Sequence, residues 1–382
     1  MPSQRQVDPE RLPETLSTIP GLEVLREAAA GFPCYLVGGV VRDLLLGQPR
    51  TDIDVAVEAD VRPIANALGG EVVEHERFAT ASVSVDGLHV DLARARAETY
   101  ERPGALPTVT PATIAEDLAR RDFTINAMAV PLTAEPTLID PHGGVDDLRA
   151  GLLRVLHERS FLDDPTRALR AARYAARFDL ELEPATAELL SSADLGTVSS
   201  ERVEAELGLI AAEDTAPRAL ELIAEWSLLE LPGDAVGLAG QVRELAARPP
   251  WSGFADPTAA ILAASGFGHA AAPVRRAAAE LAGATPERPS QAVREVKGTS
   301  PVELLLARAM GAEWLDRYVE EWSKVSLEID GADLLKNGVE EGPAVGRGLE
   351  AALSAKLDGE ISGRDQELRI ALAAARGEIP ED

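Results

Sequence analysis

A diglycine, Gly38-Gly39, stands between a strand-like segment and a helix-like segment, and this arrangement constrains the fold more than any other feature. Cys34–Val37 is apolar and rich in residues that favour strands, whereas Val40–Leu46 has a helical pattern. Glycines at such a turn let a ligand approach the backbone closely, and the free N–H groups of the helix start favour an anion. The sequence therefore predicts a phosphate-binding turn, with Gly39 and the nearby Arg42 as contacts.

Asp52 and Asp54 follow in the alternating run Thr-Asp-Ile-Asp-Val-Ala-Val, which predicts a strand. Side chains two apart in a strand leave the same face, so both carboxylates are expected side by side. Oxygen ligands on one face suit Mg²⁺, and two such ions about 3.5–4 Å apart can activate a hydroxyl and stabilise a leaving pyrophosphate. The pair alone is also compatible with a polar strand edge or a turn. Combined with the diglycine and Arg42, it favours nucleotidyl transfer with Asp52 and Asp54 as catalytic metal ligands.

Asp91 lies after an Asp86-Gly87 turn between two alternating runs, a pattern typical of a β-hairpin. A third carboxylate on a strand beside the first two would complete a two-metal site or accept the proton of the attacking hydroxyl. Aspartate also commonly ends hairpin strands, so both interpretations of Asp91 stay open. Arg96 and Glu98, which follow closely, are expected to form an ion pair that shapes the site.

Composition places the chain among soluble globular proteins of several domains: 382 residues, 46% hydrophobic and 26% charged. No apolar run is long enough to span a membrane, and the N-terminus lacks the pattern of a signal peptide, so a cytoplasmic protein is expected. The net charge of −27 argues against a broad basic surface for nucleic acid, although not against a local strip of arginines. The single cysteine, Cys34, excludes an intramolecular disulfide, and the five histidines lack metal-ligand spacing.

The alternation of short strands and helices from about residue 31 to 150 predicts a small α/β domain. After Gly151 the strand pattern fades, and helical segments continue to the end, with breaks expected at 246–253 and 285–290. The strands expected in the α/β domain are Cys34–Val37, Ile53–Val57, Ala81–Val85, His89–Ala93 and Ala127–Val130, and the helices are Val40–Leu46 and Val61–Leu68.

Arginines recur every three or four residues in the helical segment that begins at Asp163-Asp164-Pro165. With Asp164 at its edge, this charged face spans about 120° of the helix and comprises Arg167, Arg170, Arg173 and Arg177. Such a face is often simply solvated and paired within its helix. A carboxylate beside a guanidinium also matches the edge of a nucleobase, so Asp164 and Arg167 are candidates to read cytosine and adenine. Arg170 and Arg173 would support them and bind phosphate.

Two further clusters carry charges between apolar residues. Arg120-Arg121-Asp122 precedes the apolar run to Ala129, and its ordinary interpretation is the end of a helix or strand with arginine–aspartate pairing. Asp140, close to Gly143-Gly144, has the composition of a structural turn.

These segments, taken in order, resemble the motifs of the class II CCA-adding tRNA nucleotidyltransferases and bacterial poly(A) polymerases. The resemblance rests on 36–43 with 52–54, 120–127, 140–148, 163–173 and 200–204, and on the glycine-containing segment 329–346. Asp163 stands where the family usually has glutamate. The family's His-Asp phosphohydrolase domain is not expected, because no His-Asp pair occurs in the chain.

The resemblance implies an α/β head with a polymerase-β-like nucleotidyltransferase palm, followed by an all-helical neck, body and tail. The corresponding divisions are an N-terminal helical extension at 1–30, the head at 31–150, the neck at 151–215, the body at 216–322 and the tail at 323–382. It also implies Mg²⁺ at Asp52 and Asp54, nucleotide contacts from Arg121, and base pairing by Asp164 and Arg167. The implied partners are CTP, ATP and the acceptor end and elbow of tRNA.

Several functions remain open at this level. Within the family they are full CCA addition, addition of CC only or of A only, and poly(A) synthesis. Outside it they are a catalytically silent RNA-binding module and a nucleotidyltransferase that modifies protein. Nothing in the sequence predicts the oligomeric state.

Overall fold

The computed structural model describes residues 7–48, 52–75, 80–85, 87–132, 135–268 and 270–378. Its contacts divide the chain into two compact units, one formed by 1–206 with 222–229 and the other by 207–221 with 230–382. In the described ranges, every helix is too short or too polar to cross a membrane. The predicted turn residue Asp86, His269 and the first six residues of the N-terminal extension lie outside the described residues.

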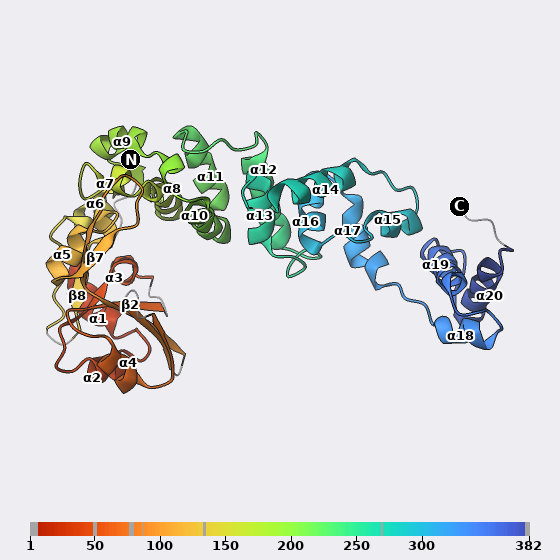
Figure 1. Ribbon diagram of the computed structural model, residues 1–382, viewed down its shortest axis with the longest axis horizontal. Helices are drawn as coiled ribbons and strands as arrows, with labels where there is room; N and C mark the ends of the chain where they lie inside the picture. The colour runs from red at the N-terminus through yellow and green to blue at the C-terminus, as the bar shows by residue number, and fades with distance from the viewer. Residues whose placement is uncertain are drawn as a thin grey trace. The chain divides into compact units, whose positions relative to one another are not determined.

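A six-stranded mixed sheet forms the centre of the first unit (Figure 1). Its order is β3-β4-β5-β2-β1-β8, in which β2 and β5 are parallel and the other neighbours are antiparallel. The strands are β1 (Cys34–Val37), β2 (Asp52–Val57), β3 (Glu71–His75), β4 (Thr80–Val85), β5 (Leu88–Arg94) and β8 (Ala129–Pro131). The predicted α/β head is therefore confirmed, and β4 and β5 pair as the predicted hairpin.

The sequence did not predict β3 or the two strands of a hairpin, β6 (Arg96–Thr99) and β7 (Thr108–Pro111). All four residues of β7 are exposed, so this strand carries no buried face to create an apolar alternation. A short parallel pair, β9 (Leu152–Leu153) with β10 (Glu181–Leu182), is a small exception to the helical character expected after Gly151.

The two faces of β2 have different roles. Ile53, Val55 and Val57 are buried, whereas Asp52 and Asp54 are exposed, as the alternation predicts. Ala56 shares the face of the aspartates and lies under α5 (Ile114–Ala119), whose Ile114 and Leu118 join it in an apolar cluster. The helix α5 therefore lies on the sheet face that carries the aspartates, which brings the residues after its C-terminus close to Asp54.

The remaining helices of the first unit surround this sheet or continue the chain beyond it. The helix α8 buries its alanine-rich side, with Ala168, Leu169 and Ala172 fully inaccessible, so the opposite side carries the arginines. The helices are α1 (Leu12–Leu16), α2 (Leu22–Ala28), α3 (Gly39–Leu45), α4 (Arg62–Leu68), α6 (Gly144–Ala150), α7 (Ser160–Asp163), α8 (Thr166–Phe178) and α9 (Pro184–Leu189). Two further helices, α10 (Ser200–Ala212) and α11 (Ala216–Glu225), have residues in both units.

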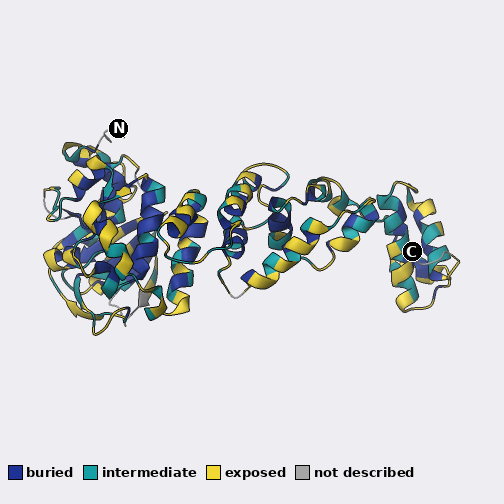
Figure 2. Cartoon of the chain, turned by 90° about the horizontal axis from the view of Figure 1, so that it is seen from above, coloured by how far each residue is buried: buried dark blue, intermediate teal, exposed yellow. Residues whose placement is uncertain are grey.

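The chain after α11 is helical, which confirms the predicted helical region (Figure 1). Figure 2 shows both buried and exposed stretches on the helices of this region. The predicted break at 246–253 begins at the last residue of α12, and the one at 285–290 includes the first two residues of α15; the rest of each lies between helices. The helices are α12 (Ala235–Ala246), α13 (Pro257–Ser265), α14 (Ala271–Gly283), α15 (Pro289–Glu295), α16 (Pro301–Ala309), α17 (Trp314–Glu320), α18 (Gly331–Lys336), α19 (Pro343–Leu357) and α20 (Arg364–Ala375). The division into extension, head, neck, body and tail stays a prediction.

The last three helices have a small apolar core of their own, which includes Leu334, Ala352 and Ala371. Gly348 of α19 lies against α20 so closely that a Cβ would come within 2.5 Å of the Ala371 carbonyl oxygen. Glycine is therefore required there by the close approach of the two helices, not by its backbone angles.

Candidate active site

One cavity of about 540 Å³ in the first unit collects nearly all the predicted site residues. Its lining includes Gly38, Gly39, Arg42, Asp54, Arg121, Asp164, Arg167, Arg170 and Arg173. Asp52 is absent from this lining, although it lies two residues before Asp54 on the same exposed face of β2. The fold thus joins residues from the strand β2, the diglycine turn, the end of α5 and the helix α8 around one space.

Asp54 lies beside two other carboxylates. In the parallel pairing of β2 and β5 its register partner is Asp91, whose Oδ1 accepts a hydrogen bond of 2.5 Å from Ser82. Although the Asp54 side chain is exposed, the protein around it partly removes the carboxyl from water and so raises its pKa; the charge of Arg121 opposes this rise, and the charges of Asp91 and Asp52 add to it. A cation at this position would relieve the unfavourable charge.

Asp52 and Asp54 fit a magnesium ion as a pair of carboxylate ligands. In the described parts of the chain, no three His, Cys, Asp or Glu side chains are arranged so that they alone hold a metal. Mg²⁺ needs no such cage, because it commonly takes one or two carboxylates and completes its shell with water and substrate phosphates. Asp52 and Asp54, two carboxylates on one open strand face, match that requirement.

The diglycine turn makes room for a guanidinium. Gly38 has φ +66°, in the region that favours glycine, and a Cβ there would lie 2.5 Å from Arg121 Nη1. A Cβ added at Gly39 would lie 3.4 Å from Arg42 Nη2. Two arginines therefore approach the backbone of the predicted phosphate-binding turn.

Arg42 is more enclosed than its predicted role suggests, with 3% of its surface exposed. Its Nε donates to Asp43 Oδ1 at 2.9 Å, and its Nη1 donates to Asn126 Oδ1 at 2.5 Å. The guanidinium also lies 4.2 Å from the centre of the Phe178 ring. Arg42 still borders the cavity, but much of its donor capacity is used within the protein, and its triphosphate contact stays a prediction.

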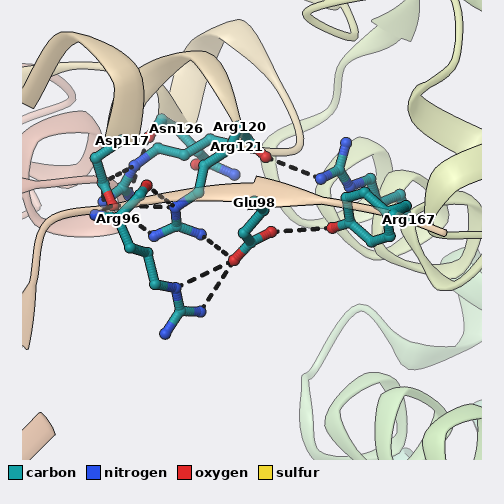
Figure 3. Close-up of polar contacts among 8 residues, drawn as sticks. Arg96, Glu98, Asp117, Arg120, Arg121, Asn126 and Arg167 are labelled. Atoms are coloured by element: carbon teal, nitrogen blue, oxygen red, sulfur yellow. Dashed lines mark hydrogen bonds and ion pairs between the residues drawn. The ribbon is translucent and has the colours of Figure 1, made fainter. Parts of the chain in front are cut away.

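A buried aspartate, Asp117, holds the two arginines that follow α5 (Figure 3). Its Oδ1 accepts from Arg120 Nη2 at 2.7 Å, and its Oδ2 accepts from Arg121 Nη2 at 2.9 Å. Burial would raise the pKa of Asp117, but the two guanidinium groups hold it below its usual value. The arginines of the Arg120-Arg121-Asp122 cluster do pair with an aspartate, but their partner is Asp117, whereas Asp122 pairs with Arg170. The pair with Asp117 fixes Arg121 across the diglycine turn.

Glu98 joins this network from the β6 strand (Figure 3). It lies 3.1 Å from Arg96 Nη2, which confirms the predicted ion pair, and it accepts from Arg120 Nη1 at 2.9 Å. Tyr100 donates to its other oxygen, and burial followed by the charge of Glu98 raises the pKa of Tyr100 to about 12. This cluster forms a wall of the cavity.

Asp164 uses one carboxylate oxygen for contacts within the protein. Its Oδ1 accepts from Thr166 Oγ1 at 2.6 Å, from the Thr166 backbone N–H at 3.0 Å and from Arg202 Nη2 at 2.9 Å. These three contacts orient the carboxylate at the start of α8, beside the cavity.

Arg167, in the first turn of α8, is also held by hydrogen bonds within the protein. Its Nη1 donates to Ser160 Oγ at 2.7 Å, and its Nη2 donates to the backbone carbonyl of Arg120 at 2.8 Å. Two of the five N–H bonds of the guanidinium are so engaged, which leaves donors for a ligand in the cavity. Figure 3 shows Arg167 reaching toward the segment that carries Arg120.

Acidic residues from other segments pair with the other arginines of α8. Asp122 accepts from Arg170 Nη2 at 2.6 Å, and Glu206 of α10 accepts from Arg170 Nη1 at 3.2 Å. Glu206 also lies 3.7 Å from Arg173. Burial would raise the pKa of Asp122, but Arg170 and the amide of Asn126 hold it at about 2. The acidic partners come from distant segments, which the helix sequence alone does not reveal.

Asp140 has the structural role expected of it. Its two oxygens accept from the backbone N–H groups of Gly144 and Val145, at 2.8 and 3.0 Å, and so cap the start of α6. It is not part of the cavity lining.

Several lining or supporting residues were not predicted individually: Tyr100, Asp117, Asn126, Ser160, Thr166 and Glu206. Only Asp117 carried a local indication, since it precedes Arg120 and Arg121 by three and four residues, the spacing of neighbours on one helix face. The others join the site through long-range packing.

With this geometry, the relatives of the chain become informative. Residues 34–154 match the model of the poly A polymerase head domain. A CC-adding tRNA nucleotidyltransferase of Deinococcus radiodurans is 34% identical over 376 residues, which cover 94% of this chain and 94% of that protein. The chain belongs to the class II tRNA nucleotidyltransferase and poly(A) polymerase family. This membership confirms the resemblance and the enzyme class that the motifs indicated.

Two further relatives carry other activities in their names. An A-adding tRNA nucleotidyltransferase of Halalkalibacterium halodurans is 47% identical over 192 residues, which cover 47% of this chain and 45% of that protein. The chain thus spans less than half the length of that relative. The solved Thermotoga maritima CCA-adding enzyme complexed with tRNA has a TM-score of 0.72 and 30% identity, with 96% of each chain covered.

Proposed function

We propose that this protein adds CMP and AMP, from CTP and ATP, to the 3′ end of tRNA in the cytoplasm, with Mg²⁺ as its cofactor. The observation that carries the proposal is the single cavity that joins Asp54 and the Arg121–diglycine turn to Asp164 and Arg167. One part of this space suits a triphosphate, and the other suits the edge of a base.

In this proposal Asp52 and Asp54 hold Mg²⁺, which would lower the pKa of the attacking hydroxyl and neutralise charge on the pyrophosphate. The 3′ oxygen of the RNA forms a bond to the α-phosphorus, and the bond from that phosphorus to the bridging oxygen of pyrophosphate breaks. Gly39 and Arg121 bind the triphosphate, and Arg121 is kept in place by Asp117. Asp91, in register with Asp54, is placed to act as a third ligand or as an acceptor of the hydroxyl proton.

The base is chosen by hydrogen-bond pattern. Cytosine and adenine each present a ring nitrogen that accepts beside an amino group that donates. Arg167 donates and Asp164 accepts, so this pair matches both bases. Uracil and guanine present the reversed pattern, with a donating ring N–H beside an accepting carbonyl, and would place two donors or two acceptors face to face. Arg170 and Arg173 support the base-reading pair and bind the phosphates.

The RNA partner is proposed to be tRNA, held at its acceptor end by the first unit and at its elbow by the tail. The strongly acidic net charge of −27 disfavours a broad, sequence-independent RNA surface, which a poly(A) polymerase with many substrates would need. The solved relative in complex with tRNA supports this choice.

The deciding experiment supplies each nucleotide singly to tRNAs that end before the first C, after CC and after CCA. A CCA-adding enzyme extends the first with CTP and the second with ATP, and leaves the third unchanged. A CC-adding enzyme, the activity of the Deinococcus radiodurans relative, stops after CTP addition, and an A-adding enzyme acts only on the CC end. Extension of the CCA end by many adenylates would instead indicate a poly(A) polymerase. Binding of tRNA without any incorporation would indicate a silent RNA-binding module.

A further inference from the structure

Two buried hydroxyl groups lie behind the base-reading pair. Ser160, the first residue of α7, is fully inaccessible, and Thr166, the first residue of α8, is 4% exposed. A hydroxyl in such a place is expected to make hydrogen bonds, because an unpaired buried polar group is unfavourable. Each of these two hydroxyls bonds to one member of the predicted base-reading pair.

Thr166 sets the orientation of Asp164. Its Oγ1 and its backbone N–H both donate to Asp164 Oδ1, at 2.6 and 3.0 Å. Arg202 donates to the same oxygen. With Oδ1 saturated by contacts from the protein, Oδ2 becomes the oxygen that faces a ligand, and the plane of the carboxylate is restricted.

Ser160 does the same for Arg167. Its Oγ accepts from Nη1 at 2.7 Å, while the Arg120 carbonyl accepts from Nη2 at 2.8 Å. A planar guanidinium held at both terminal nitrogens cannot turn about its Nε–Cζ axis or swing about its side-chain torsions without breaking one of these bonds. The side chain is 5% exposed, so only a small part of it is accessible to a ligand.

From this geometry we propose that Ser160 and Thr166 are positioning residues that set the fidelity of base selection. Discrimination between cytosine and uracil depends on a donor and an acceptor that cannot exchange places or rotate to meet the reversed pattern. The two hydroxyls remove that freedom. The inference rests on the proposed function and identifies which residues give the base-reading pair its specificity.

The test compares Ser160→Ala and Thr166→Val with the unchanged full-length protein, using a tRNA that ends before the first C. The measured quantity is kcat/KM for CTP divided by kcat/KM for UTP, together with the melting temperature. Each substitution should lower this ratio about tenfold, since one hydrogen bond to a charged group is lost. The conservative variants Ser160→Cys and Thr166→Ser should restore most of the ratio, because they keep a group able to hydrogen-bond.

The matched control is Thr186→Val. Thr186 is 1% exposed in the same unit, and its hydroxyl accepts from Val155 N at 3.2 Å and donates to Glu183. It is outside the cavity lining, so its substitution should lower the melting temperature without changing the CTP to UTP ratio. If Ser160→Ala and Thr166→Val behave like this control, the hydroxyls are structural only and the inference is wrong.

The proposed function can fail separately. If the unchanged protein incorporates neither CTP nor ATP into any tRNA end, the proposed function is wrong, and the inference falls with it. If the unchanged protein incorporates CTP and both variants keep its selectivity, only the inference is overturned. If one of the two variants does not fold, its conservative partner is measured in its place. An unchanged CTP to UTP ratio in that conservative variant, together with a lowered ratio in the other variant, supports the inference. A reduced ratio in Thr166→Ser contradicts it.

Discussion

Arg121 lies directly across Gly38, so that a Cβ on the glycine would come within 2.5 Å of Arg121 Nη1. The glycine also has φ +66°, which side chains rarely adopt. This one contact joins the diglycine turn to the end of α5 and places a guanidinium at the predicted triphosphate position.

Gly38→Ala is therefore expected to displace Arg121 and raise the Kd for CTP and ATP at least about tenfold, as loss of a charge-assisted contact implies. The matched control is Gly47→Ala, at the other end of α3, where φ is +69° and no atom lies within 4 Å of the Cβ position. Both variants should lose about 1 kcal/mol of stability from the strained backbone. Isothermal titration separates them, and equal nucleotide affinities would contradict the contact's role.

Asp117→Asn should weaken nucleotide binding by a different route. The change removes the charge that holds Arg120 and Arg121, which leaves two guanidinium groups without their buried anion and costs about 3 kcal/mol of stability. The Kd for CTP should rise about tenfold, since Arg121 no longer stays over the turn. Glu183→Gln, which breaks a partly buried pair with Arg154 away from the cavity, serves as the control: its melting temperature should fall while its Kd stays unchanged.

The stability of the protein should fall in acid through Asp122. The pKa of this carboxyl is about 2 in the folded state, compared with 3.8 ordinarily, so the folded state prefers the ionised form. Its contribution of about 2 kcal/mol is present above pH 4 and is lost as the pH falls toward 2. Urea unfolding at a series of pH values measures this slope. Asp122→Asn should flatten it in that range, and an unchanged slope would show that Arg170 does not depress the pKa.

Asp52→Asn and Asp54→Asn should each reduce nucleotide incorporation at least about a thousandfold, because each removes a ligand from the proposed magnesium site. Binding of tRNA, measured by filter retention, should survive, since these aspartates are not expected to contact the tRNA body. Asp60→Asn, an exposed aspartate shortly after β2, is the control and should keep full activity. Chelation of divalent metal should abolish incorporation by the unchanged protein, and full activity in either site variant would refute the metal assignment.

Local features were predictable because they depend on neighbouring residues. The strand Cys34–Val37 has the predicted bounds, and the following helix begins at Gly39, one residue before the predicted Val40, since alternation and glycine act over a few residues. The arginine face of α8 was also predictable, because a helix with one alanine-rich side must present its long charged side chains on the other. The exposed strand β7 was not, because it buries no face.

The sequence by itself therefore determined the family, the mixed α/β head, the helical remainder and the residue types available for the site. Only the tertiary structure decided which groups meet: that Asp122 and Glu206 balance Arg170, that Asp117 holds Arg120 and Arg121, and that Arg42 is enclosed. The physical reason is that hydrogen bonds and ion pairs depend on distances of a few ångströms between segments far apart in the chain, and packing sets those distances. The spacing of residues along the chain does not determine these distances.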